Sequence, residues 1–376
     1  ACTCETLCAE GSVNPDCPVC GAEGADLSAC QGEAPSACIC ETLCAEGSVN
    51  PDCPVCSAEG ADLTACQGEA PAMLAMAAPL ADEATVYVGS KELKTTVGTL
   101  VYAKTDDSGN VQAATSDENY NISWNGETLT LNDANIQEAA TLPSPWNDGS
   151  AAIFCMGNLT ISLEGSNTVE GQLNTNGNSC GILTANGGLT IQGSGILEVT
   201  GGTATASGES SPSSIAIQSG GNLNIQGEGV TVTATGGKAS YAGDKSGRNS
   251  YSYGIRVTEG NVTITGSTVT ATGGDLTTDG DSYGIYVRGN GTITINGGSL
   301  TATGGDTDDG SSYGIQSGGL TVEGGGTVIA KSGQADSYSR GIGGGVTDNS
   351  GGVEGRGGLA GRYSIAIEGT ATIAGG

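Results

Sequence analysis

Short runs in which apolar and polar residues alternate recur along most of the chain after residue 126. Three neighbouring copies, residues 253–275, 283–306 and 313–333, each contain three such runs separated by glycines. A period of two predicts β-strands with one buried face, and glycine supplies the tight bends between them. We therefore expect each copy to form one coil built from three short strands.

The copies are marked by a Gly-Ile or Ala-Ile step whose spacing varies. The steps start at Ala152, Gly181, Ala216, Gly254, Gly284, Gly314 and Gly341. Their intervals are 29, 35, 38, 30, 30 and 27 residues, and the variation falls in one loop after the third strand. A constant coil with a variable loop is typical of a solenoid whose insertions emerge on one side, so the pattern predicts an all-β parallel β-helix of about eight or nine coils.

The alternation also assigns the inner and outer faces of the coils. We expect two walls of stacked apolar residues inside and the intervening threonines outside, where they suit an exposed pleated surface. The first wall contains Leu189 and Ile191, Leu223 and Ile225, Val262 and Ile264, Ile293 and Ile295, and Leu320 and Val322. The second wall contains Val232 and Ala234, Val269 and Ala271, and Leu300 and Ala302.

Composition divides the chain into five segments. Residues 1–36 and 37–72 form a Cys-rich tandem repeat, 73–85 a linker, 86–120 a strand-rich N-terminal cap and 121–376 the β-helix. The apolar run 72–81 is shorter than the stretch of about 18 residues that crosses a membrane, so we expect no membrane span. Residues 370–376 match 292–298, where a coil is only partly complete. We therefore expect the natural chain to continue, or the open coil to pair with another subunit.

The two Cys-rich units carry six cysteines each, with the spacing C-x-C-x3-C-x8-C-x2-C-x9-C. So small a unit cannot bury enough surface to fold unaided, so covalent or metal cross-links must hold it. We expect three disulfides per unit, with the pairing undetermined. The alternative is a zinc site in which Cys17 and Cys20 join two of the three preceding cysteines. The twelve cysteines are Cys2, Cys4, Cys8, Cys17, Cys20, Cys30, Cys38, Cys40, Cys44, Cys53, Cys56 and Cys66.

Overall composition removes several functional classes. The 376 residues include 41 acidic and 12 basic ones, a net charge of −29, and no histidine. The lack of histidine excludes Ser-His-Asp and Cys-His catalysis and His-ligated zinc, and so acidic a chain will not seek nucleic-acid phosphates. The cysteine framework and a first residue, Ala1, that is not methionine indicate a secreted, extracellular protein from which a signal peptide has been removed.

The arrangement of these segments resembles known surface proteins. The residues concerned are the Cys-rich units, the cap segments VYVGSKEL and YNISWNGETLTL, and the GNLTI and TATGGD motifs of the coils. Their order is similar to that of large secreted surface proteins of Gram-positive gut anaerobes. The coils are similar to the carbohydrate-binding β-helix domain of clostridial surface proteins, a calcium-binding relative of the pectate lyase fold. Over residues 86–376 the resemblance implies a parallel β-helix at the cell surface, but that family's calcium ligands have no residue-by-residue match here.

A column of tyrosines is the first candidate binding site. Tyr253, Tyr283 and Tyr313 precede the Gly-Ile step in three successive coils, and Arg340 takes this position in the next coil. A row of aromatic rings beside acidic loops could hold sugar rings by their apolar faces. The alternative is a structural ladder in which each ring packs on the next.

Two acidic loops in successive coils, GGDLTTDGDSYGI and GGDTDDGSSYGI, are the second candidate site. Stacked carboxylates from flexible loops suit Ca²⁺, which prefers oxygen ligands. The alternative is a solvated acidic surface. The candidate ligands are Asp275, Asp279, Asp281, Asp306, Asp308 and Asp309.

The remaining reactive groups do not assemble into a predicted active site. Cys155 and Cys180 lie in adjacent coils but four positions out of register, a separation of about 13 Å, so we expect two free thiols and no disulfide. Coil register places Arg256 beside Tyr286 and away from Arg288. Carboxylates do not recur in pairs on a strand face, as paired acid–base catalysis would need, so no catalytic residue is assigned.

These patterns favour a non-enzymatic extracellular surface protein with adhesin-like glycan binding on the loop side of the β-helix. The expected partners are extracellular glycans or other surface proteins, and the candidate cofactor is Ca²⁺. The alternative hypothesis is a structural subunit of a self-assembling filament or stalk. In that case the coils stack end to end and the Cys-rich modules bridge subunits.

Overall fold

The computed structural model describes residues 83–116, 119–146, 148–207, 210–242 and 249–343, with three further short strands at 359–360, 365–367 and 370–374. By its internal contacts the chain divides into two units, Ala1–Leu80 and Ala81–Gly376, and every described residue belongs to the second. The Cys-rich repeats and the linker lie outside the described residues, so their disulfides and the zinc alternative stay predictions.

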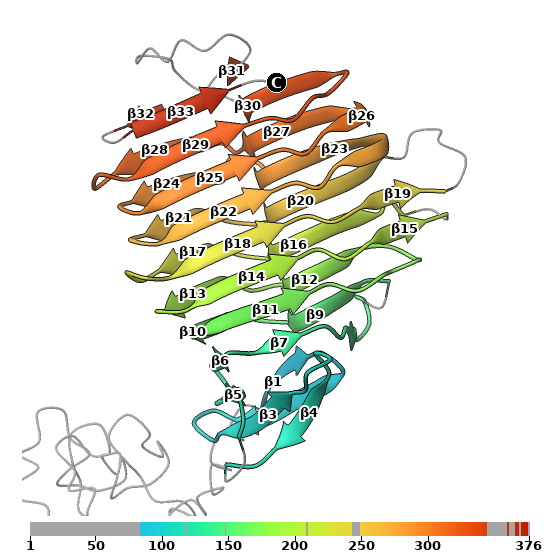
Figure 1. Cartoon of the computed structure of the whole chain (residues 1–376), viewed down its shortest axis with the longest axis vertical. Helices are drawn as coiled ribbons and strands as arrows, with labels where there is room; N and C mark the ends of the chain where they lie inside the picture. The colour runs from blue at the N-terminus through green and yellow to red at the C-terminus, as the bar shows by residue number, and fades with distance from the viewer. Residues whose placement is uncertain are drawn as a thin grey trace, which may run out of the picture. The chain divides into compact units, whose positions relative to one another are not determined.

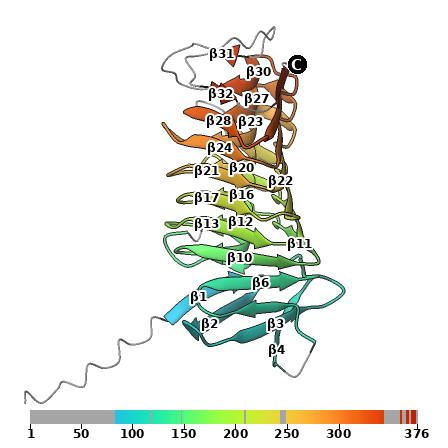
Figure 2. The ribbon, with the colours of Figure 1, turned by 90° about the vertical axis from the view of Figure 1, so that its left-hand side faces the viewer.

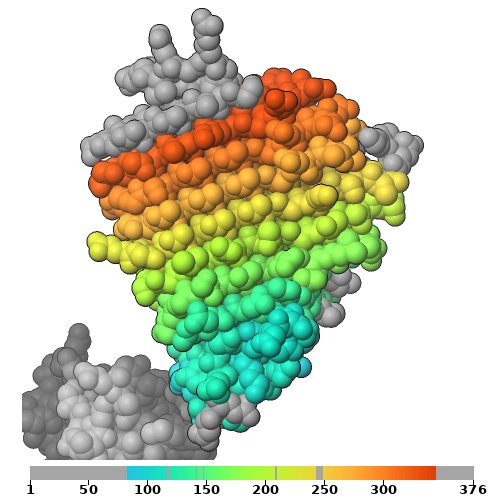
Figure 3. All heavy atoms as spheres, viewed as in Figure 1, coloured from blue at the N-terminus to red at the C-terminus, as the bar shows by residue number. Residues whose placement is uncertain are grey.

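The described residues form an all-β protein whose strands stack into a parallel β-solenoid (Figure 1). Three long sheets, here called sheets 1, 2 and 3, surround a common core. In each turn the chain passes through sheet 1, then sheet 2, then sheet 3, and a loop leads to the next turn. The layers are visible at the surface as successive coloured bands (Figure 3). None of the described residues forms a helix long and apolar enough to cross a membrane.

The solenoid strands have the following bounds. Sheet 1 contains β9 (Ser150–Cys155), β12 (Ser179–Thr184), β16 (Ser213–Ser219), β20 (Ser250–Val257), β23 (Leu276–Val287), β27 (Ser311–Gln316), β30 (Tyr338–Gly343) and β31 (Leu359–Ala360). Sheet 2 contains β6 (Thr128–Asn132), β10 (Leu159–Glu164), β13 (Leu189–Gly193), β17 (Leu223–Gln226), β21 (Val262–Thr265), β24 (Thr292–Asn296), β28 (Gly319–Glu323) and β32 (Ile365–Ile367). Sheet 3 contains β7 (Asn135–Ile136), β11 (Ser166–Glu170), β14 (Ile196–Thr200), β18 (Thr231–Thr235), β22 (Thr268–Thr272), β25 (Ser299–Thr303), β29 (Thr327–Lys331) and β33 (Thr370–Ala374). Shorter strands in the connections are β8 (Ala140–Thr141), β15 (Ala204–Ala206), β19 (Ala239–Tyr241) and β26 (Thr307–Asp309).

The register of the sheets confirms the two predicted inner walls. In sheet 2, Leu223 pairs with Val262 and Val262 with Ile293, and all are fully buried. In sheet 3, Val269 pairs with Leu300 one turn later. Because the same position repeats in every turn, like side chains stack on like, and the buried apolar area grows with each turn.

Seven turns contribute one strand to each of the three sheets within the described residues, from β9–β10–β11 to β30–β32–β33. This is fewer than the eight or nine coils expected from the sequence. The difference arises at the N-terminal end, where β6 and β7 form only part of a turn. The preceding strand, β5 (Ile122–Trp124), pairs antiparallel with β6, so parallel stacking starts at Thr128 and not at residue 121.

An antiparallel cap closes the N-terminal end of the core. It consists of β1 (Glu83–Val88), β2 (Lys91–Thr96), β3 (Val101–Thr105), β4 (Val111–Ala114) and β5, and Figure 2 shows it beneath β6. β1 pairs antiparallel with β9, placing Val88 opposite Ile153. Trp124 is 1% exposed, and its Nε1 donates to the carbonyl of Ala84 at 3.3 Å. The cap thereby covers the open end of the solenoid and pairs its edge strands.

A ladder of buried serines closes the corner between the sheet 3 strands and the next sheet 1 strand. Ser252 Oγ donates to the Gly237 carbonyl at 2.9 Å and accepts from the Gly274 amide at 2.8 Å. Ser282, one turn later, makes the same pair of bonds. The paired glycines allow this approach, because a Cβ on Gly274 would lie 2.4 Å from the Gly237 oxygen. The loops that follow the sheet 3 strands therefore all start from a corner with the same backbone geometry.

Candidate functional site

Two columns of side chains run up the outer face of sheet 1, on either side of the Gly-Ile steps. Their members cluster separately from the inner core. Glycine is needed between the columns in the later turns, since a Cβ on Gly284 would lie 2.6 Å from the Gly314 oxygen. The first column is Ala151, Cys180, Ile215, Tyr253, Tyr283, Tyr313 and Arg340. The second column is Phe154, Leu183, Gln218, Arg256, Tyr286 and Gln316.

The tyrosines of the first column form a stacked ladder. The Tyr253 and Tyr283 rings lie 5.1 Å apart with an 8° interplanar angle, and Tyr283 and Tyr313 lie 5.1 Å apart at 5°. The three side chains are 5–9% exposed, and burial raises the pKa of Tyr253 and of Tyr283 above the usual range. Because the ring faces cover one another, a sugar cannot lie on them in the way the first interpretation required. The structure shows the stacked ladder of the alternative interpretation, and a ligand-binding role for Tyr253, Tyr283, Tyr313 and Arg340 stays a prediction.

Arginines cover rings of this ladder. The Arg256 guanidinium carbon lies 5.2 Å from the centroid of the Tyr253 ring. Arg340 follows Tyr313 in the column, as predicted, and lies 5.9 Å from that ring and 4.3 Å from the ring of Tyr338. Such cation–π contacts contribute about 0.5–2 kcal/mol each. They hold the guanidinium groups against the ladder while leaving their edges available as hydrogen-bond donors.

A cavity of about 430 Å³ lies over the tyrosine ladder, and we call it the tyrosine cavity. Its open aromatic surface comes from the half-buried rings of Tyr251 and Tyr286, the latter packed edge-on against Tyr283 at 5.1 Å. Among the described residues, its lining consists of Asn178, Ser211, Ser213, Tyr251, Tyr253, Arg256, Asp281, Tyr283, Tyr286, Arg288 and Gln316. Two of the predicted tyrosines, Tyr253 and Tyr283, thus line the cavity, but the more exposed rings belong to their neighbours Tyr251 and Tyr286.

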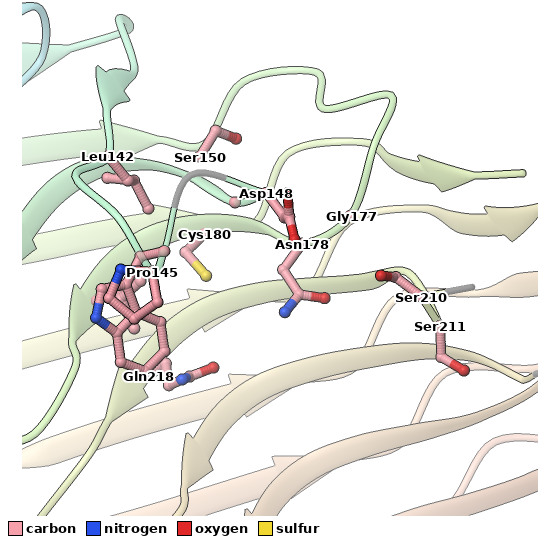
Figure 4. Close-up of a pocket in the computed structure, with 13 residues that line it drawn as sticks. Leu142, Pro145, Asp148, Ser150, Gly177, Asn178, Cys180, Ser210, Ser211 and Gln218 are labelled. Atoms are coloured by element: carbon pink, nitrogen blue, oxygen red, sulfur yellow. The ribbon is translucent and has the colours of Figure 1, made fainter. Parts of the chain in front are cut away.

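A second cavity, of about 230 Å³, lies nearer the cap and is called here the tryptophan cavity. Figure 4 shows the Cys180 sulfur and the Gln218 amide directed toward the space that Asn178 borders. It is lined by Leu142, Pro145, Trp146, Asp148, Gly149, Ser150, Gly177, Asn178, Cys180, Leu183, Ser210, Ser211 and Gln218. Asn178 and Ser211 line both cavities, so the two adjoin and form one elongated depression, the sheet 1 groove.

Unpaired polar atoms concentrate in this groove. Within the described residues, six buried side-chain nitrogen or oxygen atoms have no hydrogen-bond partner, and five of them belong to residues that line the groove. An unpaired buried polar group costs about 1–3 kcal/mol, so native proteins contain few of them. Their gathering in residues along one depression identifies the groups that would gain most from hydrogen bonds to a ligand. The five atoms are Trp146 Nε1, Ser150 Oγ, Gln218 Oε1, Arg256 Nε and Gln316 Oε1.

The positive charges in the groove lack ion-pair partners. Arg256 and Arg288 line the tyrosine cavity, and neither makes an ion pair with another described residue. Asp281 is engaged within the protein: one carboxylate oxygen accepts the Ser311 amide at 2.9 Å and the other accepts the Tyr283 hydroxyl at 3.2 Å. Two free guanidinium groups in a chain of net charge −29 favour a ligand rich in hydroxyl or carboxylate oxygens.

The acidic loops do not bring their carboxylates together around one point. Asp275 accepts the Asp306 amide at 2.9 Å, and Asp306 accepts the Gln334 amide at 2.8 Å, so these side chains bridge successive turns. Asp279 and Asp309 face each other in register between β23 and β26. Across the part of the chain that the structure describes, no three acidic or cysteine side chains gather in a way that could hold a metal ion. Calcium binding, including the proposed contribution of Asp308, stays a prediction.

The two cysteines outside the repeats are free and buried, as expected. Cys180 pairs with Ala151, four positions before Cys155, which confirms the predicted offset. Cys155 faces the inner core, whereas Cys180 lies in the first outer column and lines the tryptophan cavity. The register prediction that Arg256 lies beside Tyr286 is also confirmed.

Sequence reasoning did not identify Trp146, Ser150 or Gln218 as site residues. Trp146 lies in a connection that has no counterpart in other turns, so no repeat indicates its position. Gln218 follows an Ala-Ile step and could have been found by aligning the position that Arg256 and Tyr286 occupy in later turns. Comparison with protein-family models, with curated proteins and with solved structures finds no match to this chain.

Proposed function

We propose that this chain is a non-enzymatic extracellular surface protein that binds a glycan in the sheet 1 groove. The observation that carries the proposal is the concentration of unpaired buried polar atoms there, five of the six among the described residues. A ligand that supplies hydrogen-bond partners removes their desolvation penalty on binding. These atoms are buried in the unbound chain, so binding requires side-chain rotations of the kind common at binding interfaces.

The mixture of groups suits a sugar better than a purely apolar molecule. Tyr251 and Tyr286 offer half-buried rings for the apolar face of a pyranose, while Arg256, Arg288 and Gln316 offer donors and acceptors for its hydroxyls. The tyrosine cavity, at about 430 Å³, has the size of a small-molecule site, and the groove continues from it into the tryptophan cavity. An extended chain of sugars fits such an elongated shape.

A binding role without catalysis is supported by the chemistry of the groove. The sequence contains no histidine, and the Asp281 carboxylate accepts hydrogen bonds from the Ser311 amide and the Tyr283 hydroxyl. A general base or nucleophile needs an oxygen that is open to the substrate. The extracellular location rests on the Cys-rich units and on the resemblance to secreted surface proteins.

The test is a glycan array probed with the full chain and with a Tyr286→Ala variant. We expect binding of the wild-type chain to at least one class of glycan and a loss of about tenfold or more in the variant, because an aromatic contact at the centre of a site contributes about 1–3 kcal/mol. Tyr120→Ala is the matched control, since Tyr120 is a 43% exposed cap residue that lines neither cavity. An array with no binding would contradict the proposal, and ordered polymers in negative-stain images would then favour the structural subunit.

A further inference from the structure

The tryptophan cavity has a lining that is distinct from the rest of the groove. Its volume of about 230 Å³ is below the range of roughly 300–1,000 Å³ that holds a whole small ligand. It therefore suits one substituent of a larger molecule. Because it adjoins the tyrosine cavity through Asn178 and Ser211, that molecule would be the glycan bound in the rest of the groove.

Three kinds of group meet in this cavity. Gln218 is 9% exposed, and its Oε1 is an acceptor without a partner. Trp146 Nε1 is a donor without a partner. Leu142, Leu183 and the thiol of Cys180 are 2–5% exposed and form an apolar wall. Gln218 and Trp146 thus bring one acceptor and one donor without partners beside an apolar wall, and Asp148, Asn178 and three serines complete the described polar lining.

We infer that the tryptophan cavity is a subsite for the acetamido group of an N-acetylated sugar. An acetamido group has one N–H to donate to Gln218 Oε1, one carbonyl to accept from Trp146 Nε1, and one methyl group to pack against the apolar wall. The Ser150 hydroxyl, also without a partner, can donate to the second lone pair of the carbonyl oxygen. This inference rests on the proposed function and names the class of sugar that the groove prefers.

Other sugar substituents match the lining less well. A hydroxyl can donate to Gln218 Oε1 or accept from Trp146 Nε1, but it has no apolar part to cover Leu142 and Leu183. A carboxylate has no N–H or O–H to donate to Gln218 Oε1, and it would share the cavity with the Asp148 carboxylate. A protonated amine could pair with the Asp148 carboxylate, but it offers no acceptor to Trp146 Nε1 and no methyl group to the apolar wall.

The inference is tested with pairs of glycans that differ only in this group. The probes are chitotriose and cellotriose, which share length and linkage, and N-acetylgalactosamine and galactose oligosaccharides of equal length. We expect the full chain to bind the N-acetylated member of a pair about tenfold more tightly, the discrimination that one or two buried hydrogen bonds provide. Titration on the array, repeated by isothermal calorimetry, measures this ratio.

Two variants test whether the preference for N-acetylated sugars comes from the tryptophan cavity. Gln218→Leu removes the amide, and leucine fits there because Leu183 occupies the preceding position of the same column. Trp146→Phe removes the Nε1–H and keeps a ring. Each variant should lower the ratio of the two affinities within a glycan pair toward one without abolishing binding. The matched control is Gln226→Leu, at an exposed residue of sheet 2, and it should leave this ratio unchanged.

The outcomes separate this inference from the proposed function. If glycans bind but both members of each pair bind equally, the acetamido subsite is wrong and glycan binding stands. If the preference exists but survives both Gln218→Leu and Trp146→Phe, the subsite lies elsewhere and the inference fails. If no glycan binds the wild-type chain, the proposed function fails and the inference fails with it. The melting temperature of each variant should stay close to that of the wild-type chain. A loss of the preference then results from the lost contacts and not from unfolding.

Discussion

At the scale of single residues, the second outer column of sheet 1 shows that the turn in which a residue lies decides whether its side chain is apolar or polar. Phe154 and Leu183 occupy it in the first two turns, and Gln218, Arg256 and Tyr286 in the next three. Each has nearly the same backbone geometry, because the sheet repeats once per turn. The change from apolar to polar side chains along the column therefore follows from what covers the sheet in each turn. The unpaired polar atoms lie in the turns over which the groove passes.

The buried thiol of Cys180 gives a prediction about alkaline pH. Burial raises the pKa of Cys180 to about 12, although the Arg256 charge nearby acts in the opposite direction. In the unfolded chain the thiol has a pKa of about 8.5, so it ionises there first. The stabilisation is complete below pH of about 8.5 and is lost progressively as the pH rises toward the folded-state pKa.

We therefore expect the free energy of unfolding to fall more steeply with pH in the wild-type chain than in a Cys180→Ala variant. The difference in slope should approach about 1.4 kcal/mol per pH unit between pH 9 and 11. Urea unfolding at several pH values measures it. Ile215→Val, next in the same column, is the control, because it removes a methyl group and no titratable one. Equal slopes in wild type and Cys180→Ala would show that the thiol is not buried in the folded state.

At the scale of strands and turns, the sequence predicts most of the solenoid. Residues such as Ile264 and Ile295 repeat with a fixed offset, and their stacking follows from the repeat alone. The same argument fails for the groove. Trp146 lies in a connection present once, and the groove exists because that connection and the later loops stand over sheet 1. Loop conformation depends on contacts between segments far apart in sequence, which a strand period does not encode.

The tyrosine column shows a second limit of sequence reasoning. The period correctly aligns Tyr253, Tyr283 and Tyr313, yet it cannot distinguish rings that face a ligand from rings that face each other. The spacing of parallel strands, about 4.8 Å, is also the spacing at which aromatic rings stack. Burial of the rings follows, and the reachable aromatic groups become Tyr251 and Tyr286.

The corner between sheet 3 and sheet 1 gives a prediction at the scale of one turn. Gly274→Ala places a Cβ 2.4 Å from the Gly237 oxygen and 2.5 Å from the Gly236 oxygen, both in the rigid backbone of the previous turn. The corner must shift and weaken the bond from the Gly274 amide to Ser252. We expect a loss of about 1–3 kcal/mol or more in unfolding free energy.

The matched control for this substitution is Gly157→Ala, where a Cβ meets nothing within 4 Å. That variant should be neutral or slightly more stable, since alanine restricts the unfolded chain. Urea unfolding monitored by circular dichroism compares the two. Equal stabilities for Gly274→Ala and Gly157→Ala would mean that the corner is not tightly packed.

At the scale of the whole molecule, the described unit is a stack in which each turn contacts its neighbours, closed at one end by the cap. Stability in such a stack is the sum of turns and of interfaces between adjacent turns. A destabilising substitution in the cap should therefore lower the stability of the turns next to the cap more than that of distant turns. The two cavities of the groove lie at different heights, because β12 and β16 stand between β9 and β20.

Trp124→Ala tests this organisation. The substitution empties a fully buried site in the cap and removes the hydrogen bond to the Ala84 carbonyl, at a cost of about 3–5 kcal/mol. We expect hydrogen exchange to lose protection in β1, β5, β6 and β9 while β22 and β25 keep theirs. Tyr120→Ala, a change at an exposed residue of the same cap, should affect at most β3, whose Tyr102 ring it contacts, and leave the protection of the solenoid strands intact. Because the tyrosine cavity is built on β20, β23 and β27, glycan binding there should persist while the preference set by the tryptophan cavity weakens. Simultaneous loss of protection in every turn would instead show that cap and solenoid unfold as one cooperative unit, and binding and preference would then disappear together.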